Sequence, residues 1–289
     1  MIRDIEAKTI LGTLKQPDPW FGLKYNFNLY RGCQHQCIYC DSRSECYQIE
    51  NFSDILVKVN GIEILDKELS KKRVKGTIGT GSMNDPYMPL EAARRMTARA
   101  LDLIAKYAFP VHIITKGNLV VRDIPVLQEI AKVYAAVSFT ITTSDDHLGK
   151  KIEPGAPLVS ERFAAMKKIS SAGILTGITM MPILPYIEDN EKNIESIIEM
   201  AADNGAKYII PAFGVTLRDR QRDYYYQKLD LNFPGLREKY SRRYGNKYFA
   251  QSDNSNIIQS VFTDSCAKYQ IETKMPFYQS NSSGQLSLF

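Results

Sequence analysis

A regular alternation of short apolar runs and amphipathic stretches extends from about residue 24 to residue 213 of this 289-residue chain. Six runs have the length and composition of strands: 25–30, 74–80, 111–116, 136–142, 174–181 and 207–213. Helical periodicity marks 90–107, 124–133, 159–172 and 190–204. Because repeated βα units build a parallel sheet, the pattern predicts an α/β fold. No dinucleotide-type glycine fingerprint follows the first run, which favours a partial (β/α)6 TIM-type barrel over a doubly wound sheet.

The alternation ends near residue 213, and we expect three parts. Residues 1–213 form the barrel, and residues 214–276 form a basic, mainly helical C-terminal extension with a helix near 256–269. Residues 277–289 form a flexible tail rich in Ser, Asn and Gly. With 44% hydrophobic residues the chain can bury a sizeable core.

The strand runs also predict which side chains face the barrel interior, because alternate residues of a strand face opposite sides. In 136–142 the apolar residues should meet the helices, and the hydroxyls Ser138, Thr140 and Thr142 should face the interior. In 111–116, Lys116 lies at the end of the strand. Barrel chemistry gathers at the C-terminal ends of strands, so we expect a polar ligand there.

Four of the five cysteines lie between residues 33 and 46, directly after the first strand run. An odd, clustered set indicates metal ligands and not a disulfide framework. Cys33, Cys37 and Cys40 can hold a cubic iron–sulfur cluster and leave one iron without a protein ligand. The alternatives are a structural zinc site, with Cys46 or His35 as fourth ligand, and unmetallated thiols.

The CxxxCxxC spacing, with Tyr39 just before its last cysteine, resembles the radical S-adenosylmethionine (SAM) superfamily. The resemblance implies a [4Fe-4S] cluster on Cys33, Cys37 and Cys40, whose open iron binds the amino and carboxylate groups of SAM. Reductive cleavage would yield methionine and a 5′-deoxyadenosyl radical that abstracts a hydrogen atom. A reductase, flavodoxin or ferredoxin would supply the electron.

Four later stretches resemble the spore photoproduct lyase-like branch of that superfamily, also called DNA repair photolyases: 79–91, 114–123, 142–174 and 181–189. This resemblance implies that Gly79 and Gly81 approach the amino group of SAM and that Lys116 reaches its carboxylate. Its other implied cofactor-binding residues are Tyr39, Asp85, Ser138, Thr140, Thr142, Glu153 and Pro182. Structural alternatives stay open: turn glycines, loop capping by Asp85, and an ion pair between Glu153 and Arg162.

One position departs from the pattern of the branch. Its hydrogen-donating cysteine lies in a Cys-x-x-Asp pattern after strand two, where this chain has Ser82 and Asp85. A hydroxyl O–H bond is much stronger than a thiol S–H bond and cannot replace it. Repair of spore photoproduct itself is therefore doubtful.

Residues 215–250 hold nine Lys or Arg against four acidic residues, and so carry the whole formal net charge of +5. Cations neutralise phosphates and tyrosine rings stack on unpaired bases. The nucleic-acid candidates are Arg218, Arg222, Tyr225, Arg242 and Arg243. The alternative is a pair of solvated amphipathic helices with the tyrosines as their packing face.

The last five residues match the short peptide by which bacterial proteins bind the replication sliding clamp. In this interpretation Leu288 and Phe289 enter an apolar groove and Gln285 makes a polar contact, with Leu286 also part of the binding peptide. The alternative is a tail that folds onto its own body.

The sequence thus predicts a radical SAM enzyme that acts on a nucleic acid, in DNA repair or modification. The first rival is a radical SAM enzyme for RNA, a peptide or a small metabolite. The second is a zinc-bearing sliding-clamp adaptor without catalysis. We expect a cytoplasmic protein with no membrane partner, because the start lacks an apolar signal region and every apolar run is too short to span a bilayer.

Overall fold

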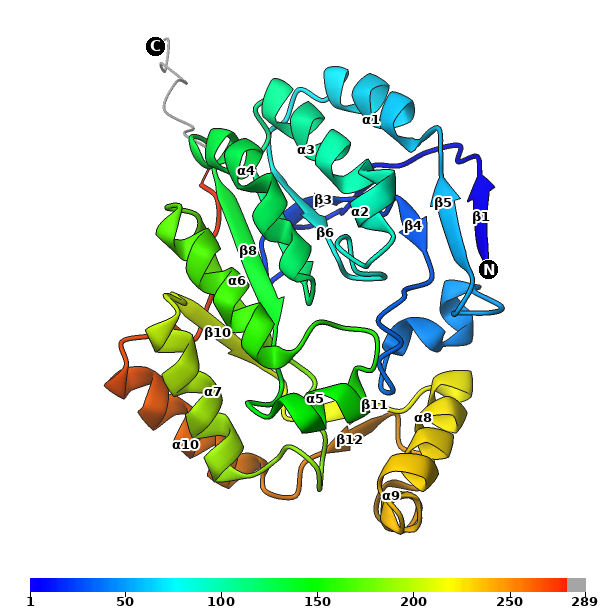
Figure 1. Cartoon of the computed structure of the whole chain (residues 1–289), viewed down its shortest axis with the longest axis vertical. Coiled ribbons are helices and arrows are strands. Elements are labelled where there is room, and N and C mark those ends of the chain that lie inside the picture. The colour runs from blue at the N-terminus through cyan, green and yellow to red at the C-terminus, as the bar shows by residue number, and fades with distance from the viewer. Residues whose placement is uncertain (280–289) are drawn as a thin grey trace, which may run out of the picture.

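The computed structural model describes residues 1–279, and a seven-stranded sheet forms its centre. Six neighbouring strands are parallel and follow chain order: β3 (Leu23–Asn26), β6 (Thr77–Thr80), β7 (Val111–Thr115), β8 (Ala135–Thr140), β9 (Leu175–Met180) and β10 (Tyr208–Pro211). β2 (Gly12–Thr13) pairs antiparallel with β3 at one edge, and β10 forms the other edge. Each predicted strand run overlaps one of the six strands, although β3 and β8 begin one or two residues before their runs, and the sheet stays open. The partial barrel is confirmed (Figure 1).

Helices cover the outer face of this sheet (Figure 1). The helices between β5 and β10 are α1 (Gly61–Ser70), α2 (Glu91–Arg94), α3 (Met96–Lys106), α4 (Ile124–Ala131), α5 (Asp146–Ile152), α6 (Val159–Ser171) and α7 (Glu191–Asp203); of these, α5 packs its Ile152 with Cys37 and Tyr39 of the cysteine loop. The predicted helix 90–107 is two helices, because Arg95 adopts a left-handed conformation (φ 51°) between them. The buried Glu91 carboxylate accepts from the N–H groups of Thr97 and Ala98, and so caps α3.

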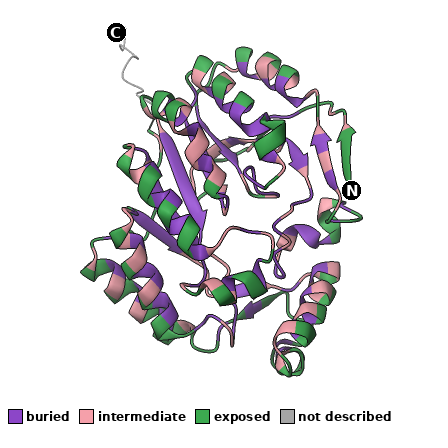
Figure 2. Ribbon diagram, viewed as in Figure 1, coloured by how far each residue is buried: buried purple, intermediate pink, exposed green. Residues whose placement is uncertain are grey.

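The strand alternation is confirmed on β8 and its continuation. Val137, Phe139 and Ile141 are fully buried in the core between sheet and helices, where Figure 2 shows strands buried along their length and helices exposed only on their outer sides. On the other face, Ser138 Oγ lies 2.8 Å from His112 Nε2 and 2.7 Å from the Tyr208 hydroxyl. These three buried, hydrogen-bonded side chains occupy the barrel interior at this level.

A second sheet lies beside the barrel and was not predicted. It consists of β1 (Ile2–Ile5), β5 (Ile55–Lys58) and β4 (Tyr30–Arg31), with β5 in the middle. Its strands are two to four residues long and β1 is mostly exposed, so they carry too little apolar pattern to be recognised. β4 leads directly into the cysteine loop.

The C-terminal part consists of β11 (Gly214–Thr216), α8 (Asp219–Asn232), α9 (Leu236–Tyr244), β12 (Phe249–Gln251) and α10 (Ser255–Lys268). α10 matches the helix predicted near 256–269 and packs against α7 (Figure 1). The chain then follows the free edge of β10, where the Ile209 N–H donates to Glu272 O (2.9 Å) and the Glu272 N–H donates to Lys207 O (3.0 Å). This part of the chain therefore packs on the barrel.

Two further predictions concern membrane-spanning helices and the C-terminal peptide. No helix among residues 1–279 is long and apolar enough to cross a membrane. The predicted clamp-binding peptide, Gln285 to Phe289, lies outside the described residues and stays a prediction.

Candidate active site

The three predicted cluster cysteines line one cavity at the C-terminal ends of β6 and β7. All three are free thiols; Cys33 and Cys37 are buried and Cys40 is partly exposed. We call this space the cysteine cavity. Its other lining residues are His35, Ser42, Gly81, Ser82, Met83, Asn84, Asp85, Ile114, Thr115, Lys116 and Thr140. The structure thus brings the thiols together with strand-end residues from distant parts of the chain, as the barrel interpretation requires.

The donor set fits an iron–sulfur cluster better than a single zinc ion. Among residues 1–279, no three Cys, His, Asp or Glu side chains converge tightly enough to hold one metal ion, whereas a cubane spreads its cysteines over separate corners. Burial raises the pKa of Cys33 to about 12 and raises that of Cys37 further. Such thiols ionise when a cationic centre binds them and offsets the cost of burial.

The two predicted candidates for a fourth zinc ligand behave differently. Cys46 is exposed and does not line the cavity; its Sγ lies 3.1 Å from Arg218 Nη1. His35 lines the cavity and is buried, with Nδ1 3.3 Å from Asp85 Oδ2. Cys46 therefore does not supply a fourth zinc ligand. The His35 ring lies beside the Asp85 carboxylate.

Lys116 is held at the cavity by a buried carboxylate, Glu153. Its Nζ lies 3.8 Å from Glu153 Oε1, which also accepts a hydrogen bond from the Tyr39 hydroxyl. Glu153 Oε2 lies 2.5 Å from Arg162 Nη1, so the structural ion pair left open by the sequence is present. Burial alone would lower the pKa of Lys116, but Cys37 and Glu153 outweigh it and raise that pKa. The cavity therefore presents a charged ammonium group.

Asp85 ties the loop after β6 to the end of β7. Its carboxylate accepts from Thr115 Oγ1 (2.6 Å), from the Lys116 N–H (2.6 Å) and from the Tyr87 N–H (2.8 Å). Burial would raise the pKa of Asp85, but His35 and these hydrogen bonds lower it well below its usual range. Asp85 therefore stays ionised, and it fixes the backbone that carries Lys116.

The two predicted glycines have different reasons to be glycine. A Cβ on Gly81 would meet the Ile114 carbonyl oxygen at 2.0 Å, and Gly81 has φ +103°, so only glycine fits this turn at the cavity. A Cβ on Gly79 would meet the Leu23 side chain at 2.4 Å. Gly79 therefore allows β3 to pack against β6, and it does not line the cavity. Its expected role in approaching SAM stays a prediction.

Of the three predicted hydroxyls, only Thr140 lines the cysteine cavity. Ser138 is fully buried between His112 and Tyr208 and does not line the cavity. Thr142 is buried and Pro182 is half-buried, and neither lines the cavity. The sequence interpretation did not place Ser42, Ile114 and Thr115 in the site. Their closeness to Cys40 and Lys116 in the sequence was the available signal.

The basic segment holds the cysteine loop in place. The Arg220 guanidinium donates to the carbonyl oxygens of Arg43 (3.1 Å), Ile49 (2.8 Å) and Glu50 (3.3 Å). On the same helix, Gln221 Nε2 donates to Tyr39 O at 3.1 Å. Figure 1 shows α8 beside the loop that follows β4. A loop with little regular structure needs such donors for its buried carbonyl groups.

The tyrosines of this segment form a core. The Tyr225 hydroxyl donates to that of Tyr240 (3.0 Å), which donates to Pro185 O (2.8 Å). Tyr225 is fully buried, so its expected stacking on nucleic-acid bases was wrong. The helices close over the cysteine loop with their tyrosines inside, as the structural alternative states.

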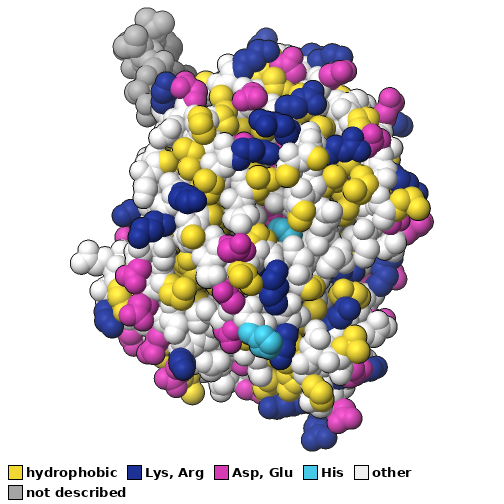
Figure 3. Space-filling model, viewed as in Figure 1, with side chains coloured by type: hydrophobic (Ala, Val, Ile, Leu, Met, Phe, Trp, Pro, Cys, Tyr) yellow, Lys and Arg dark blue, Asp and Glu magenta, His cyan; other side chains and the backbone are white. Residues whose placement is uncertain are grey.

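Most of the candidate arginines are bound by the chain itself. Arg218 lies 3.2 Å from Asp41, Arg222 donates to the carbonyl oxygens of Leu217 and Lys247, and Arg243 lies 2.6 Å from Asp253. Arg242 is exposed and has no ion pair within the described chain. Figure 3 shows the cations over α8 and α9 interspersed with acidic and hydrophobic side chains.

Comparisons with known proteins agree with this geometry. The family model of the Radical SAM superfamily matches residues 27–204. An uncharacterized protein of Mycobacterium tuberculosis is 26% identical over 257 residues, which cover 86% of this chain and 75% of the relative. An uncharacterized protein of Methanocaldococcus jannaschii is 33% identical over 190 residues, which cover 65% of this chain and 69% of the relative.

A solved structure of spore photoproduct lyase complexed with dinucleoside spore photoproduct superposes with a TM-score of 0.70 at 17% identity. The superposition covers 93% of this chain and 79% of the lyase, and it shows that the two proteins share a fold. The family match covers more than half of the chain and includes the cysteine loop and four of the six parallel strands, β6, β7, β8 and β9. The chain therefore belongs to the Radical SAM superfamily of enzymes, whose chemistry depends on SAM and an iron–sulfur cluster.

Proposed function

We propose that this enzyme abstracts a hydrogen atom from a nucleic-acid substrate, in DNA repair or modification. The observation that carries the proposal is the cysteine cavity, where Cys33, Cys37 and Cys40 face Lys116 at the strand ends. Three thiols in one cavity fit a [4Fe-4S] cluster with one iron left for SAM.

When bound, the cluster and SAM supply the electron transfer and the hydrogen abstraction. The residues of the chain position them. The Lys116 ammonium group is the partner for the SAM carboxylate, and the bare backbone at Gly81 allows close approach of the amino group. Glu153, tied to Tyr39 and Arg162, fixes the position of Lys116 and keeps this side of the site closed to water.

The nucleic-acid substrate is supported by the fold shared with spore photoproduct lyase, which has been solved with a dinucleoside spore photoproduct.

Because residue 82 is a serine, no thiol at this position can donate a hydrogen atom to a product radical. Ser82 lines the cavity and is exposed, where the related branch has its hydrogen-donating cysteine. Apart from the three cluster ligands, no cysteine of residues 1–279 lines the cavity: Cys46 lies outside it and Cys266 is buried in α10. We therefore infer that the substrate differs from spore photoproduct.

The test measures transfer of a hydrogen isotope from the substrate into 5′-deoxyadenosine. Reconstituted enzyme, dithionite and SAM are incubated anaerobically with sugar- and base-deuterated DNA, either intact or ultraviolet-irradiated, and with RNA of the same sequence. Deuterium recovered in 5′-deoxyadenosine with DNA is the expected result. Two results would contradict the proposal. Deuterium transfer from RNA alone would favour an RNA substrate, and 5′-deoxyadenosine formation that does not change with any added nucleic acid would favour a peptide or metabolite.

A further inference from the structure

A second cavity, of about 300 Å³, lies next to the cysteine cavity. Met83 and Asn84 line both, so they form the wall between them. The rest of its lining comes from the small sheet, the segments that adjoin β1 and β4, and the cysteine loop: Ile5, Glu6, Ala7, Asn28, Tyr30, Arg31, Ile49 and Lys58. We call this space the Arg31–Lys58 cavity.

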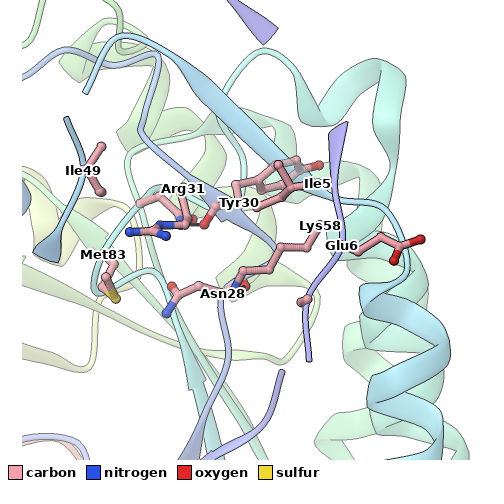
Figure 4. A pocket seen from close by; sticks show the side chains of 10 residues that line it. Ile5, Glu6, Asn28, Tyr30, Arg31, Ile49, Lys58 and Met83 are labelled. Atoms are coloured by element: carbon pink, nitrogen blue, oxygen red, sulfur yellow. Dashed lines mark hydrogen bonds between the residues drawn. The ribbon is translucent and has the colours of Figure 1, made fainter. Parts of the chain in front are cut away.

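Two cations of the cavity have no acidic partner. Neither Arg31 nor Lys58 takes part in any ion pair found among residues 1–279. Glu6 lines the cavity, but Figure 4 shows its carboxylate pointing away from Arg31, while the Lys58 side chain extends toward Asn28 and Arg31. Both cations are half-buried. Unpaired, partly buried charges of equal sign repel each other, and an anion between them removes that cost.

Both cations are positioned by backbone groups and keep unused donors. Arg31 Nη2 donates to the carbonyl oxygens of Tyr47 (3.0 Å) and Gln48 (2.9 Å), and Lys58 Nζ donates to Asn28 O (2.8 Å). Within the described residues, the Arg31 Nε and Nη1 groups have no acceptor. These Nε and Nη1 groups can each donate to an oxygen of a phosphate, and the nearby ammonium group of Lys58 adds a point charge.

Two further observations agree with an anion. Burial lowers the pKa of Lys58, and the positive charge of the nearby Arg31 lowers it further. The Asn28 side-chain oxygen is buried without a hydrogen-bond partner. Since the two ends of an amide are interchangeable in such assignments, Asn28 can turn its N–H₂ group to an anionic oxygen instead.

We propose that Arg31 and Lys58 bind a phosphate group of the nucleotide whose reacting atom enters the cysteine cavity. This inference rests on the proposed function, and it adds where the strand is held. The subsite places the phosphate on the small sheet, away from the basic segment 215–250.

The test measures binding of a fluorescein-labelled single-stranded oligodeoxynucleotide to the reconstituted enzyme, as a function of salt. Arg31→Gln and Lys58→Gln each remove one charge and keep a hydrogen-bond donor. Each should weaken binding about tenfold at low salt and reduce the slope of log K against log salt by about 0.7. Melting temperatures of both variants, measured in parallel, show that they are folded.

Two exposed cations serve as matched controls: Arg73, between α1 and β6, and Lys167 on α6. Arg73→Gln and Lys167→Gln remove the same charge far from both cavities, and should change affinity less than about twofold. If folded Arg31→Gln and Lys58→Gln variants bind like these controls, the phosphate subsite is wrong, even when the wild type transfers deuterium from DNA.

Competition then identifies the form of the phosphate. Displacement of the oligonucleotide by thymidine 5′-monophosphate, but not by thymidine, shows that a phosphate monoester suffices; displacement only by unlabelled oligonucleotide shows that a diester is needed. Both results support the subsite, provided Lys58→Gln weakens the competitor equally. A wild type that neither binds the oligonucleotide nor responds to it in 5′-deoxyadenosine formation overturns the proposed function and this inference together.

Discussion

Two cationic regions of this protein differ in what their charges do. Residues 215–250 carry the entire formal net charge of the chain, yet Arg218, Arg220, Arg222 and Arg243 are bound to carboxylates or backbone carbonyls of the same molecule. The Arg31–Lys58 cavity holds only two cations, without an acidic partner among residues 1–279. Net charge shows where cations are concentrated, and only the structure shows which of them remain free for a ligand.

The difference has a structural cause. The cysteine loop runs from residue 32 to 54 with only two short 3₁₀ turns, so its carbonyl groups need donors from elsewhere. Arginines of α8 supply them, and the buried tyrosines behind them fix α8 and α9. The small sheet needs no such donors, because its strands pair with each other. Arg31 also donates to two loop carbonyls and Lys58 donates to Asn28 O, but neither cation has a carboxylate partner among residues 1–279, and both keep further donors for a ligand.

The largest expected effect in the basic segment comes from Arg220→Ala. The change removes the donor of three loop carbonyls, so the free energy of unfolding should fall by about 2–3 kcal/mol. Because the loop carries the cluster ligands, iron retained after gel filtration should fall as well. Denaturant unfolding and iron analysis measure both. Arg73→Ala, an exposed arginine outside the loop contacts, should stay within about 0.5 kcal/mol of wild type.

If Arg220→Ala matches Arg73→Ala in stability and iron content, the bracing role of the basic segment is refuted. The two regions would then no longer differ in the way described above.

A smaller effect is expected from Tyr240→Phe. The change removes one hydroxyl and leaves the Tyr225 hydroxyl and Pro185 O without their partner in a buried site. Stability should fall by about 1–2 kcal/mol, while oligonucleotide affinity stays that of the wild type. Tyr248→Phe, at a 55% exposed position, should change stability by less than about 0.5 kcal/mol. If Tyr240→Phe lost oligonucleotide affinity while its stability stayed unchanged, the result would contradict this account and support stacking of the tyrosines on nucleic-acid bases.

The smallest effect should come from Arg242→Gln. Arg242 is the exposed candidate of the basic segment without an ion pair in the described chain, and solvent screens its charge. Oligonucleotide affinity should change less than about twofold. A loss larger than that of Lys58→Gln would show that the nucleic acid follows α9 and not the small sheet.

The sequence predicted those parts of the molecule whose signal is local. The parallel strands were recognisable because buried strands are continuous apolar runs, as in β7 and β8, and the cluster ligands because their spacing lies within one loop. β1 and β4 escaped prediction, since two to four residues contain too few alternations.

Residue roles that depend on tertiary contacts could not be predicted. Gly79 serves strand packing against Leu23, and Asp85 joins two strand ends, which no spacing rule reveals. Tyr225 lies in a sequence that suits nucleic-acid binding equally well, and only its burial decides the matter. Composition likewise identifies residues 215–250 as the most basic segment, but it does not reveal that Lys58 lacks an acidic partner among residues 1–279.

The central claim is that Cys33, Cys37 and Cys40 alone hold the cluster through which SAM is cleaved, and one measurement tests it most directly. Wild type, Cys37→Ala and Cys46→Ala are reconstituted anaerobically with iron and sulfide, and 5′-deoxyadenosine is measured after adding dithionite and SAM. The account predicts that Cys37→Ala loses bound iron and all cleavage, whereas Cys46→Ala, whose thiol lies outside the cysteine cavity, keeps both. Unchanged cleavage by Cys37→Ala, or equal loss in Cys46→Ala, would contradict it.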